Sequence, residues 1–94
     1  MECNYPALVQ GSNVSGEKFK EEGKVVNLSR SGIFVLLNQA IPDYYEVSAR
    51  IDLPTGIAEF GSSRLTTIGT VVRSEPRGDG AFGVAIKFQH FQIH

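Results

Sequence analysis

The sequence has little of the chemistry that most catalytic and metal sites use: its 94 residues contain one cysteine, Cys3, and two histidines. A single cysteine excludes an intramolecular disulfide and a multi-thiolate metal site, and it suits a reducing compartment. Both histidines lie within the last five residues, so no pattern places an oriented base beside a nucleophile. We therefore expect no enzyme activity and no cofactor.

Two short motifs near the C-terminus are better explained without a function. His90 and His94 have the spacing of a two-histidine metal site on a helix, but no third ligand lies near them, and a fraying tail is the simpler interpretation. Arg77-Gly78-Asp79 spells the tripeptide that integrins recognise, yet Gly-Asp-Gly is also favoured turn chemistry. We predict neither a metal site nor integrin binding.

Long apolar runs and an excess of charge are also missing. No run approaches the roughly 20 apolar residues of a membrane-spanning helix, and the N-terminus lacks the features of a signal peptide, so we expect a cytoplasmic protein. Nine Lys and Arg against ten Asp and Glu give a net charge of -1. Such a chain has no global positive field to draw it onto DNA, RNA or anionic membrane, although a local basic pocket remains compatible with the composition.

The chain does have the length and composition of one folded domain. Ninety-four residues are too few for a second core, and 41% hydrophobic with 20% charged residues is typical of a globular protein. We predict a single domain over residues 1–94, as a whole protein or as a fragment of a longer one.

Short strand-like segments alternate with turn formers along the whole chain. Residues 45–53 alternate apolar and polar side chains, which predicts a half-buried strand, and the continuously apolar residues 33–37 are typical of a strand buried on both faces. After a lead-in over residues 1–6, the other predicted strands are 7–9, 17–26, 65–75 and 84–88, with a short helix over 17–22 as an alternative. Turns are expected at 11–16, 38–43, 54–56, 61–63 and 76–80.

Five to seven short strands without a ten-residue helix favour an all-β barrel or sandwich. We favour a closed antiparallel barrel, because closure removes the exposed edges that so small a sheet would otherwise present.

A polar corner between residues 24–26 and 33–37 is the main candidate for a site. Asn27 and Ser29 are two residues apart, so in an extended segment both side chains leave the same face. We expect Gly32 to supply the positive φ of a sharp bend and to let a ligand approach the backbone. The three residues could bind a phosphate or a base, or Asn27 and Ser29 could simply hydrogen-bond their own turn.

Asn27-x-Ser29-x-x-Gly32 resembles the Asp/Asn-x-Ser-x-x-Gly motif of PilZ domains. The strand over residues 46–54, the Gly69-Thr70-Val71-Val72-Arg73 segment and the Gly83-to-Phe88 segment also resemble PilZ segments, in PilZ order, so the similarity covers roughly residues 6–88. The resemblance implies a six-stranded Greek-key barrel, often followed by a C-terminal helix. It also implies that Asn27, Ser29 and Gly32 bind the bacterial second messenger cyclic di-GMP.

The other half of the PilZ signature, an Arg-x-x-x-Arg pair before the first strand, is missing, since no arginine precedes Arg30. Either the pair lies upstream of Met1 in a longer protein, or the domain has lost it. Lysines cannot copy the bidentate, planar contacts of arginine to phosphate, so Lys18, Lys20 and Lys24 are poor substitutes. Arg30 and Arg73 are the weaker cationic candidates, each with solvated surface charge as the alternative.

Two functions follow from the resemblance. The first is a non-catalytic sensor module that binds cyclic di-GMP weakly or not at all without the missing arginines, and acts on a protein partner or an attached domain. The second is a degenerate PilZ barrel that acts as a ligand-independent protein interaction module. An oligonucleotide-binding barrel is a third possibility, but only Phe19 between Lys18 and Lys20 interleaves aromatic and basic residues as such a surface requires.

Overall fold

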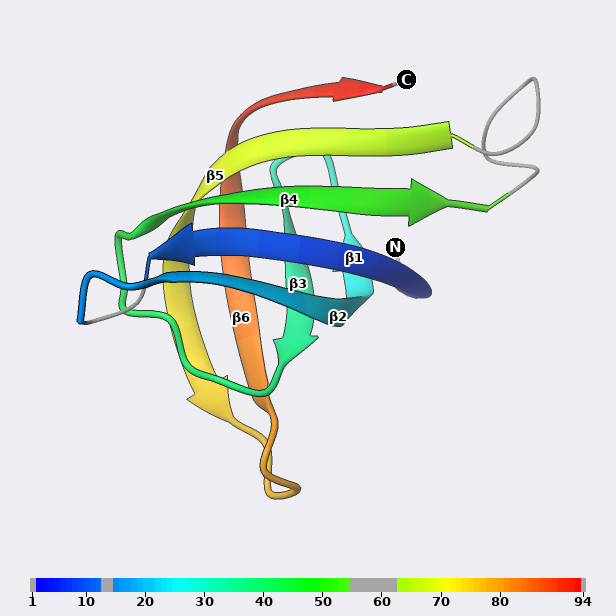
Figure 1. The fold of residues 1–94 in the computed structure, drawn as a ribbon. Helices are drawn as coiled ribbons and strands as arrows, with labels where there is room; N and C mark the ends of the chain where they lie inside the picture. Colours follow the sequence, from blue (N-terminus) through cyan, green and yellow to red (C-terminus); the bar gives the residue numbers. More distant parts are fainter. Residues whose placement is uncertain (1, 13–14, 55–62, 94) are drawn as a thin grey trace.

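A computed structural model of the chain describes residues 2–12, 15–54 and 63–93. These residues form six β-strands, and no helix occurs among them (Figure 1). The strands are β1 (Glu2–Ser12), β2 (Lys18–Leu28), β3 (Gly32–Leu37), β4 (Glu46–Leu53), β5 (Ser63–Pro76) and β6 (Phe82–Ile93).

The strands close into one antiparallel barrel in the order β1-β2-β3-β6-β5-β4, with β4 pairing back onto β1. Three consecutive strands, β1 to β3, lie side by side, and β4 returns to lie beside β1, which is the Greek-key arrangement. The predicted all-β, six-stranded Greek-key barrel is therefore confirmed. The long strands β5 and β6 bend strongly along their length (Figure 1).

Strict alternation of side chains fills the barrel interior. In β4, Val47, Ala49, Ile51 and Leu53 are buried, as the sequence periodicity predicts. The same rule puts fourteen apolar side chains of the strands into one core. Ile41, in the connection from β3 to β4, is also buried, and the Ser74 hydroxyl donates to its carbonyl at 2.8 Å and accepts from its N–H at 3.2 Å. The connection is thereby fixed to β5.

The first of the predicted segments needs correction. Residues 2–6 are not a lead-in, because β1 begins at Glu2 and pairs with β2 from there on. Gly11 and Ser12 extend β1 into the segment predicted as a turn. Residues 18–22 form part of β2, which excludes the alternative of a short helix.

The later segments need correction too. In β3 only one face is buried, since Phe34 and Leu36 on the other face are half-buried. His90 lies on β6, opposite Ile68, so residues 88–93 are a strand and neither a helix nor a fraying tail. The expected turns over 55–56 and 61–62, and His94, lie outside the described residues.

Candidate ligand-binding groove

The corner between β2 and β3 is a self-bonded turn with an exposed hydroxyl. The Ser29 N–H donates to the Gly32 carbonyl at 3.0 Å. The Ser29 Oγ lies 3.3 Å from the same carbonyl, to which it donates, and accepts from the Ser31 N–H at 3.3 Å. The Phe88 N–H donates to the Ser31 carbonyl at 2.8 Å, which fixes the corner to β6. Ser29 therefore does bond its own turn, through long contacts that an incoming acceptor could replace.

Gly32 is needed for a reason that differs from the expected one. Its φ is not positive: the described glycines with positive φ are Gly16, Gly78 and Gly80. Gly32 instead lies so close to β6 that a Cβ atom would be 2.1 Å from the Ile86 carbonyl oxygen. The predicted positive φ is wrong, and the missing side chain lets the backbone of β6 come close to the corner.

Two β-bulges turn polar residues from the interior to the outer surface. In β2, Val25 pairs with Val35 and Asn27 with Phe34, so Val26 is an extra residue and Asn27 faces outward although its spacing from buried Val25 predicts the interior. In β5, Val71 is buried, and the register shift between Val71 and Arg73 likewise turns Arg73 outward. Bulges re-aim side chains in this way next to functional sites.

The outward residues line up across five neighbouring strands. Glu2 is paired with Asn27, Asn27 with Phe34, Phe34 with Ala85, and Ala85 with Arg73. Directly opposed residues of antiparallel strands share a face, so these side chains form one row on the outer wall. The small Ala85 leaves room for Arg73 to lean over Phe34, with its guanidinium carbon 6.0 Å from the ring centroid.

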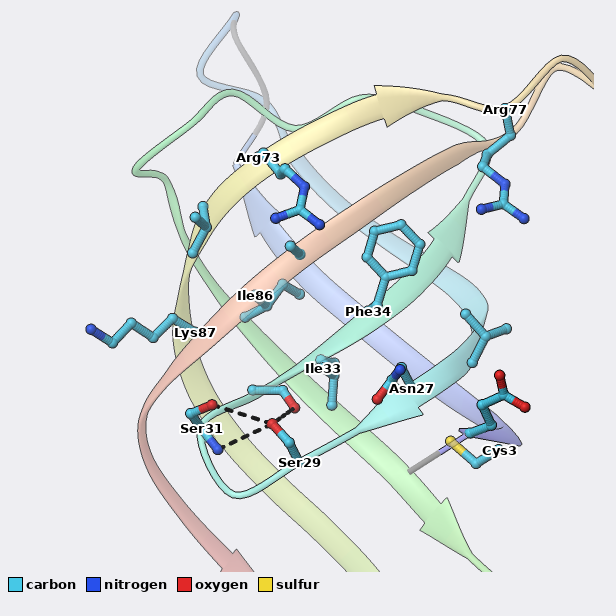
Figure 2. A pocket seen from close by; sticks show the side chains of 15 residues that line it. Cys3, Asn27, Ser29, Ser31, Ile33, Phe34, Arg73, Arg77, Ile86 and Lys87 are labelled. Atoms are coloured by element: carbon cyan, nitrogen blue, oxygen red, sulfur yellow. Dashed lines mark hydrogen bonds between the residues drawn. The ribbon is translucent and has the colours of Figure 1, made fainter.

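This row crosses a groove of about 820 Å³. Asn27, Ser29 and Gly32 line it on the side of the corner, and Arg73 lines it on the side of β5. Figure 2 shows the Phe34 ring in the floor between the Arg73 and Arg77 side chains, with Ser29 and Asn27 toward the corner.

The groove is positively charged although the chain is not. Arg73, Arg77 and Lys87 line it together with one carboxylate, Glu2, which leaves a net charge of +2 against -1 for the whole sequence. Cys3 also lines the groove, where its thiol donates to the Val25 carbonyl at 3.4 Å and burial raises the pKa of that thiol. Clefts lined by one sign of charge concentrate ligands of the opposite sign.

The predicted candidates are only partly brought together. Asn27, Ser29, Gly32 and Arg73 line the groove. Arg30, although inside the motif, is exposed and does not line it, and the same is true of Lys18, Lys20 and Lys24.

The lining residues that sequence reasoning missed include Phe34, Arg77 and Lys87. The sequence did contain a signal for Arg77. It follows Arg73 with three residues between them, the same spacing as the Arg-x-x-x-Arg pair that PilZ domains carry before the first strand. Arg77 was considered only as part of the integrin tripeptide that it forms with Gly78 and Asp79.

The family comparison agrees with this architecture. Residues 1–94 match the family model of the PilZ domain. The chain belongs to the PilZ domain family. No curated protein and no solved structure gives a significant match. In this PilZ barrel the described residues include no cluster of metal-ligating side chains and no helix long and apolar enough to cross a membrane.

Proposed function

We propose that this PilZ domain is a non-catalytic sensor module that binds cyclic di-GMP in the groove, with Asn27, Ser29 and Gly32 forming the corner that receives a phosphate. The observation that carries the proposal is that the exposed corner opens onto a groove with a net charge of +2. Cyclic di-GMP has two phosphodiester groups, each with one negative charge, so the charges of groove and ligand match.

Each corner residue has a defined part in this proposal. The Ser29 hydroxyl exchanges its 3.3 Å contact with the Gly32 carbonyl for a hydrogen bond to a phosphate oxygen. The Asn27 side chain, placed on the outer wall by the bulge in β2, binds the ligand from the next strand position. Gly32 lets the corner lie against β6, which fixes the Ser29 and Asn27 positions relative to the cations on β5 and β6.

Isothermal titration of the chain with cyclic di-GMP tests the proposal. Ser29→Ala should weaken binding about 10- to 150-fold, because a hydrogen bond to a charged group contributes about 1.5–3 kcal/mol. Ser48→Ala is the matched control, since Ser48 lies on β4 and lines a different depression. Equal affinities for the Ser29 and Ser48 variants would contradict the role of the corner.

A ligand-independent protein interaction module remains the second candidate, and two observations favour it. The Ser29 hydroxyl is bonded within its own turn, and three large hydrophobic side chains, Tyr44, Val72 and Phe91, are exposed on the described surface. Under this alternative the module binds a partner protein with unchanged affinity when cyclic di-GMP is added. Under the favoured proposal the ligand alters that contact or orders an attached segment.

A further inference from the structure

We infer that Arg73 and Arg77 supply the cationic half of the binding groove, as a phosphate clamp contributed by the end of β5 and the loop that follows it. The inference rests on the proposed function and adds to it the residues that hold the second charged part of the ligand. It also removes the need for an arginine pair before the first strand.

The fold fixes both arginines at the groove. The register shift in β5 turns Arg73 outward, and its guanidinium lies over the Phe34 ring at 6.0 Å from the centroid. Arg77 begins a tight hairpin loop, in which its N–H donates to the Ala81 carbonyl at 2.9 Å. Both side chains line the groove on either side of the ring in Figure 2.

A neighbouring glycine makes room for this arrangement. A Cβ atom on Gly83 would be 2.2 Å from Cζ of Phe34, so the ring lies directly over the space where a side chain would be. With the ring folded onto β6, the face toward Arg73 stays accessible, and a cation over an aromatic ring is favoured electrostatically. Phe34 thereby orients Arg73 without neutralising it.

The two guanidinium groups retain most of their capacity to bind an anion. Among the described residues the one carboxylate within ion-pair distance of either is Glu75, 3.8 Å from Arg73, and both side chains of that pair are at least half exposed. Exposed pairs of this kind contribute little. Asp79, which like Glu75 is two residues from Arg77 in the sequence, accepts from the Ala81 N–H at 3.1 Å instead. A phosphate can therefore displace the weak contact of Arg73 at small cost.

Arginine chemistry distinguishes this clamp from a general basic patch. A guanidinium donates two parallel hydrogen bonds to one phosphate, whereas Lys87, which also lines the groove, offers a point charge. The clamp therefore predicts that lysine cannot replace arginine at position 73, while simple charge attraction predicts that it can.

Titration calorimetry with cyclic di-GMP tests the clamp on the 94-residue chain and four variants. Arg73→Ala and Arg77→Ala should each weaken binding about 10- to 100-fold, as expected for lost hydrogen bonds to a charged group. Arg73→Lys should stay within about threefold of Arg73→Ala. Arg50→Ala is the matched control, an exposed arginine on β4 outside the groove, and it should leave affinity unchanged. Thermal unfolding of each variant verifies that it folds.

Parallel titrations of Ser29→Ala, and of a fusion with an Arg-x-x-x-Arg segment before Met1, separate the two proposals. If Ser29→Ala weakens binding while the Arg73 and Arg77 variants bind like Arg50→Ala, the clamp is overturned and the proposed function stands. If the fusion binds cyclic di-GMP and the unmodified chain does not, the clamp is likewise overturned and the proposed function stands. Absence of binding in both proteins overturns the proposed function.

Discussion

Replacing Gly32 by alanine should destabilise the barrel strongly, because the new Cβ atom would meet the backbone of β6 rather than a movable side chain. It would lie 2.1 Å from the Ile86 carbonyl oxygen and 3.1 Å from its carbonyl carbon, whereas real Cβ atoms essentially never come closer than 3.0 Å. Ile86 is paired on both sides, with Ile33 of β3 and Val71 of β5. Relief of the clash therefore requires that two ladders shift.

The expected loss is at the upper end of the cost of overpacking, about 2–3 kcal/mol. A domain of this size has a total stability of roughly 5–14 kcal/mol, so the variant should still fold. At about 4–8 °C per kcal/mol, Tm should fall by roughly 8–24 °C in a thermal scan followed by circular dichroism.

Gly16→Ala provides the control for this prediction. At Gly16 a Cβ atom would meet nothing within 4 Å, but φ is +81°, so only the backbone penalty of about 1–2 kcal/mol applies. If Gly32→Ala unfolds within about 3 °C of the unmodified chain, or at a higher temperature than Gly16→Ala, the close approach of the corner to β6 is refuted.

Three further results are expected. Gly83→Ala should cost less stability than Gly32→Ala, because the Phe34 ring can swing away whereas the backbone of β6 cannot. It should weaken cyclic di-GMP binding in a titration, and unchanged binding would contradict the role of the ring. Thr67→Val should lower the unfolding free energy by about 1–3 kcal/mol in urea, since the buried Thr67 hydroxyl donates to the His90 carbonyl at 2.7 Å; a loss below about 0.5 kcal/mol would contradict this. Burial raises the pKa of Cys3, so less thiolate is present near neutral pH and iodoacetamide should alkylate it more slowly than an unfolded control peptide; an equal rate would contradict this.

Local patterns predicted the all-β class and a closed barrel, and the resemblance to PilZ domains added the six strands and the Greek-key order. The alternation in residues 45–53 identified β4 and its buried face, because a strand with one wet face must repeat every two residues. Turn formers at 76–80 identified the β5–β6 hairpin. The ends of the strands were less predictable: Glu2 to Pro6 carry no apolar run, yet they pair with β2, and backbone hydrogen bonds in a ladder do not depend on side-chain type.

The bulges show why residue alternation alone would misplace part of the groove. From buried Val25 and Val71, simple alternation places Asn27 and Arg73 in the interior, and a single extra residue in each strand reverses that assignment. An extra residue leaves no clear mark in a run such as Val71-Val72, because both faces accept valine. Asn27 was found through its motif, which is local, whereas the Arg-x-x-x-Arg spacing of Arg73 and Arg77 lies far from the start of the first strand, where the PilZ signature has it.

The total charge of the chain was likewise a poor guide to the charge of the groove. A net charge of -1 argued against attraction to nucleic acid or anionic membrane and left only a local basic pocket possible, and the groove does gather three of the nine Lys and Arg side chains with only one of the ten acids. The positions of these charges depend on the pairing of β3 with β6 and of β6 with β5, which joins residues far apart in the sequence. Charge that is dispersed along the chain becomes local only after closure of the barrel. Binding to the groove should therefore weaken with added salt even though the protein as a whole is slightly acidic.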